Sequence, residues 1–533
     1  MFFLMLVAAL VPPPSARDLR PADANGPGCA LDVRRGGASV EAVATGLANL
    51  EDSAKITPDT VFEIGSVSKQ FIGAGLAILA QRGSLRLDDP IRRWLPELPP
   101  LYDGITIAML AHHTSGIRSW NNLAELTGRG EDSTGYDNLW VLGALARQRG
   151  LNHAPGAEYL FSNSNFVLGA LIIERASREE LNAFFRSALF EPLDMRRTRW
   201  RTNFREVVSN RAQAYGPDGR NWRLDMPLNN VAGAGGLLST TGDLQRWAET
   251  LLNPRLQDKV WGGLIRTPGS LRDGTALRYG IGIETAAIAD REALSHAGST
   301  GSYRAWFGVF PADQLSVALL CNSGAVNTED LGAEVAARFL PEGKVPDAKP
   351  NMVASVDLAG QYRNMTNDTA VKATVEQAGL RLNGGLGFGG PGRDRLKTAD
   401  GQRTLIVQRN GAGKVIGLTV TRIGNAPIML ERVGPWAPTR SDLRAFVGSY
   451  RSGEINGNQT IAVGASGLIW RDPSGAEQRL VPSYRNTFKA PDASWTLHFQ
   501  PGAGQAMSLD MSITRARRIT FKRTARPVDQ TRR

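Results

Sequence analysis

The 533-residue sequence predicts an α+β domain followed by two antiparallel β-barrel-like units. Three observations lead to this prediction. Apolar helical segments alternate with strand-like runs up to about residue 340. The composition then turns to Pro, Gly and charged residues at 342–349, which is typical of a linker. Beyond the linker, short alternating strands and Gly-containing turns replace the helical pattern, as in antiparallel barrels and sandwiches.

The C-terminal part of the chain contains an internal repeat. Residues 358–363 (LAGQYR) match residues 446–451 (FVGSYR), and strand-like runs follow each copy. The spacing implies two similar β units of about 90 residues each. We therefore expect a first domain at 28–343 and β-barrel units at 350–436 and 440–533.

Composition narrows the possible functions. The formal net charge is +11, but Lys and Arg are spread along the chain without a dense basic run, so we expect no nucleic-acid partner. The two cysteines, Cys29 and Cys321, cannot form a disulfide framework, and the five histidines show no metal-binding spacing. We therefore predict no metal site and no cofactor.

The N-terminus resembles a secretory signal. An apolar run at 2–11 is followed by PPPSA at 12–16, although no basic residue precedes the run. The run is too short to span a bilayer, and no other segment is predicted to do so. We expect residues 1–27 to be a signal-like segment and the protein to be exported to the periplasm or envelope. A misplaced start and a weak membrane anchor are the alternatives.

The chemistry of the chain is expected around residues 62–71 (FEIGSVSKQF), where a long apolar helix begins. Ser66 falls in the first turn, and Lys69 follows three residues later on the same face. A helix N-terminus favours negative charge, and a desolvated lysine can accept a hydroxyl proton. The Ser-x-x-Lys spacing therefore indicates a nucleophile and its base. A capping serine beside a solvated lysine is the simpler reading of this motif alone.

Further motifs follow in a fixed order. They are HTSG at 113–116, FSN at 161–163, the Gly-rich run VAGAGGLLSTTGD at 231–243, and HAG at 296–298 within the first of three strand-like runs. Order and intervals together resemble the serine β-lactamase and penicillin-binding-protein superfamily, especially its class C β-lactamase-like and D-aminopeptidase branch. The resemblance covers roughly 28–340, and the trailing β units make the layout similar to the three-domain D-aminopeptidases.

The resemblance implies an antiparallel sheet flanked by helices and a serine acyl hydrolase. Ser66 would become acylated, with Lys69 in the base system. The backbone N–H groups of Ser66 and of Ser299, which follows Gly298, would form the oxyanion hole. Asn163 would bind the substrate amide or position Lys69.

Phe161 departs from the family pattern. The family usually has Tyr-x-Asn here, and the tyrosine hydroxyl relays a proton to the leaving group, whereas phenylalanine has no donor. Tyr159 could replace it if the loop shifted register. Otherwise Lys69, alone or through water, does the acid–base work. Hydrolysis of amides should then be slowed more than hydrolysis of esters, because an amine leaves only when it is protonated.

His296 stands where the family commonly has the lysine of Lys-Thr-Gly, the cation that binds a terminal carboxylate. Histidine is mostly neutral at pH 7. This position therefore favours substrates without a free C-terminal carboxylate, such as amides, peptide esters or simple esters. A histidine that only packs is the alternative.

In D-aminopeptidase relatives, a loop from the last barrel enters the catalytic cleft and helps to select a free amino terminus. The candidate loops here are 470–475 and 490–494, where Asp472 or Asp492 could pair with an ammonium, although surface turns are the simpler expectation. The family fold also implies that Cys29 and Cys321 lie on neighbouring antiparallel strands. We expect two buried thiols there, with a disulfide as the alternative.

We therefore predict a D-aminopeptidase-like serine hydrolase that acts on small peptides, amides or esters. An esterase with little amidase activity is one alternative. A non-turnover envelope binding protein, suggested by Phe161, is the other. The sequence leaves the oligomeric state open.

Overall fold

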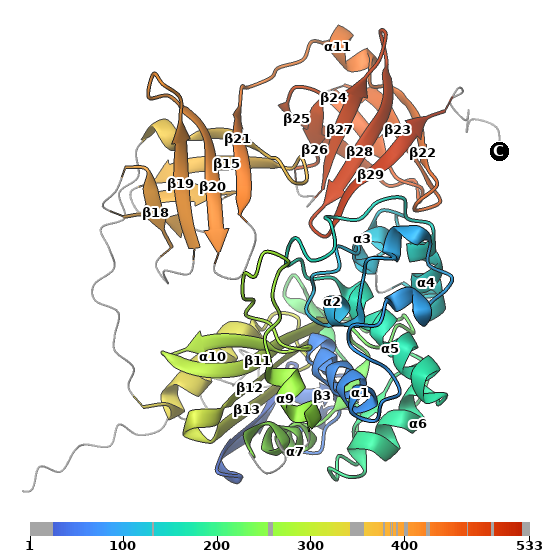
Figure 1. The fold of residues 1–533 in the computed structure, drawn as a ribbon, viewed down its shortest axis with the longest axis vertical. Helices are drawn as coiled ribbons and strands as arrows, with labels where there is room; N and C mark the ends of the chain where they lie inside the picture. Colours follow the sequence, from blue (N-terminus) through green and yellow to red (C-terminus); the bar gives the residue numbers. More distant parts are fainter. Residues whose placement is uncertain are drawn as a thin grey trace, which may run out of the picture.

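The computed structural model describes residues 25–130, 133–253, 260–341 and 356–524, apart from short gaps at 377–378, 384, 386, 391–392, 399–402, 423–426, 466 and 492–494. The described residues form an α+β domain and two β units, as predicted (Figure 1). The predicted signal-like segment and the linker at 342–349 lie outside the described residues, apart from 25–27.

A six-stranded antiparallel sheet forms the centre of the N-terminal domain, in the order β10-β11-β12-β13-β1-β2. Its strands are β1 (Cys29–Arg35), β2 (Ala38–Thr45), β10 (Glu284–Ile288), β11 (Arg291–Thr300), β12 (Tyr303–Phe310) and β13 (Leu315–Cys321). Every residue of β13 is buried, because helices cover both faces of the sheet. The three strand-like runs at 293–298, 303–310 and 315–322 are therefore confirmed as β11, β12 and β13.

Helices pack on both faces of this sheet, with α7 on one face and α10 on the other. The helices of the domain are α1 (Lys69–Gln81), α2 (Ile107–Ala111), α3 (Trp120–Glu125), α4 (Asn138–Ala146), α5 (Asn163–Ser177), α6 (Leu181–Phe185), α7 (Thr241–Leu252), α9 (Val260–Arg266) and α10 (Thr328–Phe339). The apolar helix α1 is buried from Lys69 to Leu79, so no polar face is required of it. None of the helices in the described part of the chain is long and apolar enough to cross a membrane.

Three small sheets complete the domain. They consist of β3 (Leu47–Asn49) with β4 (Ala54–Lys55); β5 (Phe62–Glu63), β9 (Leu237–Ser239) and β6 (Arg199–Trp200); and β7 (Tyr215–Asp218) with β8 (Asn221–Leu224). The pairing of β5 with β9 matters most for the site. It brings the Gly-rich segment 231–236 beside the turn that follows β5.

The first β unit is a nearly closed eight-stranded sheet, in the order β17-β16-β15-β14-β21-β20-β19-β18. A β-bridge between Gly389 and Lys397 brings its two ends together. Its strands are β14 (Gly360–Asn364), β15 (Ala370–Glu376), β16 (Gly379–Leu382), β17 (Gly387–Phe388), β18 (Arg395–Lys397), β19 (Arg403–Arg409), β20 (Val415–Arg422) and β21 (Ile428–Val433).

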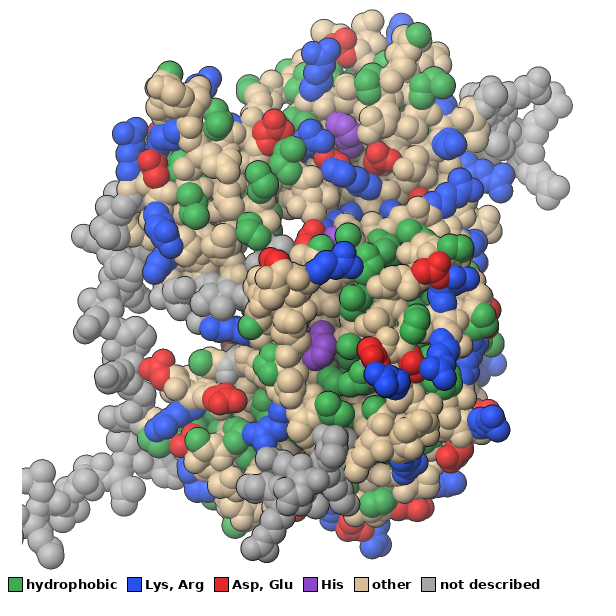
Figure 2. Space-filling model, in the orientation of Figure 1, with side chains coloured by type: hydrophobic (Ala, Val, Ile, Leu, Met, Phe, Trp, Pro, Cys, Tyr) green, Lys and Arg blue, Asp and Glu red, His purple; other side chains and the backbone are tan. Residues whose placement is uncertain are grey.

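The second β unit is a closed eight-stranded barrel preceded by α11 (Arg440–Arg444). Its strands are β22 (Gly448–Ser452), β23 (Gly457–Gly464), β24 (Gly467–Arg471), β25 (Glu477–Tyr484), β26 (Thr487–Lys489), β27 (Thr496–Pro501), β28 (Ala506–Ile513) and β29 (Ala516–Arg523). This barrel sits on the end of the N-terminal domain that carries α3 (Figure 1). On the visible face, basic and acidic side chains intermingle (Figure 2).

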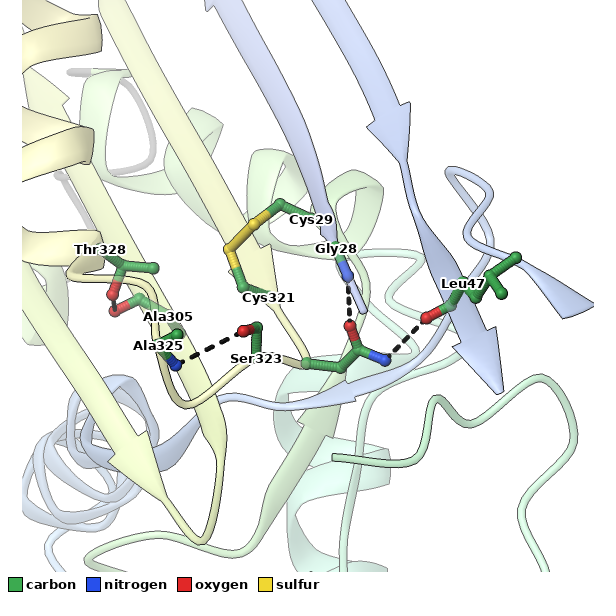
Figure 3. Close-up of a disulfide and its surroundings, with 9 residues drawn as sticks. Gly28, Cys29, Leu47, Ala305, Cys321, Ser323, Ala325 and Thr328 are labelled. Atoms are coloured by element: carbon green, nitrogen blue, oxygen red, sulfur yellow. Dashed lines mark hydrogen bonds between the residues drawn. A yellow bond between two sulfur atoms is a disulfide. The ribbon is translucent and has the colours of Figure 1, made fainter. Parts of the chain in front are cut away.

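The cysteines correct one expectation. Cys29 and Cys321 face each other across β1 and β13 with Cα atoms 4.1 Å apart, and they form a disulfide instead of two thiols (Figure 3). The pairing follows from the register, because the first residue of β1 lies opposite the last residue of β13. The bond therefore links the start of β1 covalently to the end of β13.

Candidate active site

Ser66 and Lys69 lie at the entrance of α1. Ser66 belongs to a 3₁₀ turn, Gly65–Ser68, and Lys69 is the first residue of the α-helix. The Nζ of Lys69 donates hydrogen bonds of 2.8 Å both to Ser66 Oγ and to the carbonyl of Ala234. The lysine side chain is fully buried. The predicted nucleophile–base pair is therefore in direct contact, and the Gly-rich segment supplies a second acceptor that holds the lysine.

The strand β11 passes extremely close to the serine turn at Gly298. A Cβ added to Gly298 would lie 2.0 Å from the Ile64 carbonyl oxygen and 3.2 Å from the Ser66 backbone nitrogen. A Cβ added to Gly65 would lie 2.5 Å from the Ser299 backbone nitrogen. Because neither glycine has a side chain, β11 and the serine turn can approach closely, and the backbone nitrogens of Ser66 and Ser299 lie near each other.

Asn163 begins α5 and lines the same cavity as Ser66. Its Nδ2 donates to Asn121 Oδ1 at 2.9 Å, and its backbone N–H donates to Ser119 Oγ at 3.1 Å. Its Oδ1 is buried without a hydrogen-bond partner, so Asn163 does not accept a bond from Lys69. Of the two roles expected for Asn163, a hydrogen bond from Lys69 to its side-chain oxygen is not formed, and binding of a substrate amide stays a prediction.

His113 holds the loop that carries Phe161 and Asn163. Its backbone has φ of 58°, and its Nδ1 accepts hydrogen bonds from Ser162 N and Asn165 Nδ2, both at 3.1 Å. Burial is the main cause that lowers the pKa of His113 well below its usual value, so the ring is neutral and Nδ1 can accept. His113 is therefore a neutral acceptor that holds the loop before α5 in place.

Phe161, and not Tyr159, occupies the position beside the lysine. Lys69 Nζ lies 4.7 Å from the centroid of the Phe161 ring, over its face. Tyr159 packs against His113 and Tyr279, with ring centroids 6.0 and 5.7 Å away, and it does not line the cavity. Burial raises the pKa of Tyr159. The suggestion that Tyr159 replaces the missing proton donor therefore finds no support in the geometry.

His296 is a neutral, buried ring. Its Nδ1 lies 2.6 Å from the carbonyl of Ala297, which can only accept, so this nitrogen carries the proton. Its Nε2 then accepts from the Tyr279 hydroxyl at 3.0 Å. Burial, and secondarily the charge of Lys69, lowers the pKa of His296 to about 3. The expectation that this position lacks a fixed cation agrees with these contacts, and Tyr279 is a partner that sequence reasoning missed.

A cavity of about 600 Å³ brings most of the predicted residues together. It is lined by Ser66, Phe161, Asn163, His296, Gly298 and Ser299, and Arg515 also lines it. Arg515 lies on the turn between β28 and β29 of the last barrel, and its Cζ is 4.5 Å from the centroid of the Phe161 ring. The cavity wall therefore includes a residue of the C-terminal unit.

Of the two barrel loops that the sequence suggested for the cleft, 470–475 does not line the cavity and is a surface turn, which was the simpler expectation. Asp472 closes its own turn by accepting from Ser474 N and Ala476 N, and it does not line the cavity. Asp492 lies outside the described residues. No pattern around Arg515 marked it beforehand, because a hairpin turn with an arginine is common on the surface of any barrel.

An antiparallel sheet between helical layers, with a serine and a lysine at one helix entrance, is the arrangement of the β-lactamase-like class. Residues 16–340 match the Beta-lactamase family, and the chain belongs to that family. It is 23% identical to a D-aminopeptidase from Gluconobacter oxydans over 94% of this chain and 97% of that protein.

Two other relatives match in different ways. The chain is 28% identical to penicillin-binding protein 4* of Bacillus subtilis over 44% of this chain, and the match spans only 55% of that protein. The octameric penicillin-binding protein homologue from Pyrococcus abyssi aligns over 93% of this chain and 96% of that chain, with a TM-score of 0.53 and 18% identity. The latter likeness concerns the fold alone.

Proposed function

We propose that the protein is a serine acyl hydrolase in which Ser66 forms an acyl-enzyme. The 2.8 Å bond between Lys69 Nζ and Ser66 Oγ is the observation that supports this most directly. In its neutral form Lys69 would take the hydroxyl proton as Oγ attacks the substrate carbonyl, and the leaving group would depart. Water would then release the acyl group. The backbone N–H groups of Ser66 and Ser299 would stabilise the oxyanion.

The proposed substrates are small peptides, amides or esters of the kind that a D-aminopeptidase-like enzyme cleaves. The full-length similarity to a D-aminopeptidase supports this class. Asn163, which lines the cavity, would bind the substrate amide. The second candidate is an esterase with little amidase activity, which Phe161 favours because it offers no proton to a departing amine.

Labelling with a fluorophosphonate, followed by peptide mapping, tests the nucleophile. We expect one adduct on Ser66, none in Ser66→Ala, and labelling at least about 100-fold slower in Lys69→Ala, because general-base catalysis contributes about 10²–10⁴-fold. A folded protein that gives no adduct on Ser66 under any condition would refute the hydrolase proposal, including both substrate classes.

Matched substrates separate the two candidates. The 4-nitrophenyl ester and the 4-nitroanilide of D-alanine share the acyl group and differ in the leaving group, and the L-alanine pair controls for stereochemistry. Turnover of both D-alanine compounds supports the D-aminopeptidase-like proposal. Turnover of the ester alone supports the esterase.

We also propose that the protein works in an oxidising, exported compartment. The disulfide between Cys29 and Cys321 supports this, because such bonds persist in the periplasm and outside the cell and are rare in the cytosol. Fractionation of producing cells, with thiol alkylation of each fraction, tests it. Recovery of the protein only in the cytosol with both thiols alkylated would contradict the proposal.

A further inference from the structure

Tyr279 is a buried tyrosine that lies close to the Ser66 cavity without lining it. Its ring packs against His113 and Tyr159, with centroids 4.9 and 5.7 Å away, and its hydroxyl donates to His296 Nε2 at 3.0 Å. Burial raises the pKa of Tyr279 well above its usual value, so the hydroxyl keeps its proton. Tyr279 is therefore a fixed hydrogen-bond donor behind the wall of the cavity.

The backbone that follows Tyr279 is packed against helix α1. A Cβ added to Gly282 would lie 2.3 Å from the Lys69 carbonyl oxygen, so the segment 279–282 lies directly against the start of the helix. The carbonyl of Tyr279 also accepts a hydrogen bond from Gly269 N at 3.1 Å. The tyrosine side chain therefore extends from a backbone that is held in place at the back of the helix that carries the lysine.

The hydroxyl of Tyr279 determines which nitrogen of His296 carries the proton. Because the hydroxyl donates to Nε2, this nitrogen must be an acceptor, and a neutral ring then has its single N–H at Nδ1. Nδ1 lies 2.6 Å from the carbonyl of Ala297, which can only accept. The ring therefore bonds to its own strand, at the residue directly before Gly298.

Tyr279 thus connects the two elements that form the site. The segment after it lies against α1, which carries Lys69, and its hydroxyl reaches β11 at His296. Gly298, two residues further along β11, allows the strand to approach Ser66 but supplies no side chain that would hold it there. The hydrogen bond from Tyr279 to His296 supplies a tie between this strand and the packing behind α1.

We propose that Tyr279 is a positioning residue that, through His296, holds β11 against the serine turn and so keeps the backbone N–H of Ser299 in place for the oxyanion. The inference rests on the proposed hydrolase. It concerns a residue that contacts no substrate, because Tyr279 lies behind His296 and does not line the cavity. Removal of the hydroxyl should therefore slow the reaction more than it weakens binding.

Tyr279→Phe tests this role, because it removes only the hydroxyl. We expect the rate at which a fluorophosphonate labels Ser66 to fall about three- to ten-fold, the range that one hydrogen bond commonly contributes. For the 4-nitrophenyl ester of D-alanine, kcat should fall by a similar factor, with KM changed by less than about two-fold. An unchanged labelling rate in Tyr279→Phe would overturn the positioning role.

Tyr102→Phe is the matched control. Tyr102 is equally buried in the same domain, its hydroxyl donates to the Leu145 carbonyl at 2.9 Å, and it does not line the cavity. Both variants lose one buried hydrogen bond and should therefore lose similar stability in thermal unfolding. Only Tyr279→Phe should label more slowly. Equal slowing in both variants would show that a general loss of stability, and not the position of β11, causes the effect.

His296→Phe shows whether the tyrosine acts through the histidine. This variant keeps an aromatic ring and removes both ring nitrogens, so the hydroxyl of Tyr279 has no acceptor there. If Tyr279 acts through His296, Tyr279→Phe should have no further effect on the labelling rate in the His296→Phe background. An equal fall in both backgrounds would overturn the proposed route through His296.

Nitrogen NMR of the histidine rings separates this proposal from the hydrolase itself. The chain has five histidines, so the signals of His296 are those missing in His296→Phe. We expect a protonated Nδ1 and an unprotonated Nε2 in the wild-type protein at pH 7, and an Nε2 signal that shifts in Tyr279→Phe but not in Tyr102→Phe. An unchanged Nε2 signal in Tyr279→Phe would overturn the proposal whatever the labelling shows. A wild-type protein that gives no adduct on Ser66 but shows the shift would instead refute only the hydrolase.

Discussion

The Phe161 ring packs against aromatic and basic side chains at the cavity, and it carries no proton donor. It lies between the rings of His113 and His296, with centroids 4.4 and 6.3 Å away, and under the basic groups of Lys69 and Arg515. An aromatic face attracts cations through its quadrupole, so Phe161 can position both basic groups. In the proposed hydrolase, this ring could not donate a proton to a leaving group, which would matter for amines and little for phenolates.

Phe161→Tyr should therefore raise turnover of amides more than turnover of esters. The added hydroxyl extends from a ring that already contacts Lys69, and it supplies a donor for a departing amine. We expect the ratio of kcat/KM for the D-alanine nitroanilide to that for the nitrophenyl ester to rise about ten-fold or more. Steady-state kinetics with both substrates measures the ratio. No rise would indicate that Lys69 and water already protonate the leaving group.

His113 and His296 should make the N-terminal domain sensitive to acid. Burial lowers the pKa of both rings, to about 3 for His296, whereas an unfolded histidine titrates near pH 6.5. Below about pH 6.5 the unfolded chain therefore binds protons that the folded chain does not. Stability should fall as pH drops below this value, by up to about 1.4 kcal/mol per pH unit for each ring, and the contribution of His296 should continue until about pH 3.

Urea unfolding of wild type and His296→Gln between pH 7.5 and 5 measures this effect. The free energy of unfolding should change less steeply with pH in the variant, because one of the two buried histidines is missing. This holds whatever the stability of the variant at pH 7.5. The kinetic pH profile between pH 5 and 8 should not change shape through His296, because this ring stays neutral there. Identical slopes for the two proteins would contradict the assignment of His296 as a neutral ring in the folded state.

At the scale of elements, the site depends on how closely β11 approaches the serine turn. The strand carries no side chain at Gly298, and the turn carries none at Gly65, so the two backbones can nearly touch. Such contact places a strand N–H and a turn N–H on one side of Ser66. Helix α1 and strand β11 therefore act as one unit, although a long stretch of chain separates them.

Gly298→Ala should disable the site while leaving most of the fold intact. The added Cβ would lie 2.0 Å from the Ile64 carbonyl oxygen, so β11 must move away from the turn. Loss of one oxyanion donor costs about 10²–10³-fold in kcat, and we expect a loss of kcat/KM in this range. Gly263→Ala is the control, because a Cβ there meets nothing within 4 Å. Similar activity in both variants would argue against an oxyanion hole at this contact.

The repeat in the β units shows which features a sequence pattern predicts well. In both copies the tyrosine hydroxyl donates to the carbonyl four residues earlier, Tyr362 to Leu358 at 2.9 Å and Tyr450 to Phe446 at 2.8 Å. An arginine lies over each ring. Local spacing of this kind, like that of Ser66 and Lys69, is visible in the sequence because neighbouring residues determine the geometry.

Other features were not predictable in this way. The disulfide depends on whether two adjacent strands are in exact register at Cys29 and Cys321, and the family fold implied only that the strands are neighbours. The failure of Tyr159 as a donor depends on how His113 packs the loop before α5. Both outcomes follow from tertiary packing, which residue spacing alone does not determine.

For the whole molecule, the last barrel completes the cavity. Arg515 is 393 residues away in the chain from Asn122, which binds its backbone, so no local pattern could indicate the contact. The barrel is tied to the N-terminal domain by one buried and one partly buried ion pair. Arg118 pairs with Glu454, and Arg517 pairs with Glu158 at 3.0 Å. The cavity therefore has its complete wall only when the barrel is docked on the N-terminal domain.

The Arg118–Glu454 pair should dominate this docking. Both side chains are less than a tenth exposed, and Arg118 also donates to Gln148 at 2.9 Å and to the Arg517 carbonyl at 2.8 Å. Removal of one partner leaves a buried charge without its counterion, which typically costs about 3–5 kcal/mol. We expect Arg118→Met to weaken the docking of the barrel by about this much and to increase hydrogen exchange at 119–123 and 515–518.

Arg471→Gln provides the comparison, because it breaks an ion pair with Glu477 in the same barrel where both side chains are 47% exposed. Exposed pairs contribute about 0–1 kcal/mol, so this variant should be nearly neutral. Arg118→Met/Glu454→Leu should be less destabilised than the sum of the two single variants, because no isolated charge remains buried. Denaturant unfolding and hydrogen exchange are measured for Arg118→Met, Glu454→Leu, the double variant and Arg471→Gln, each against the wild-type protein. If Arg118→Met behaved like Arg471→Gln, the barrel would be held mainly by other contacts, such as those of the Arg515 backbone.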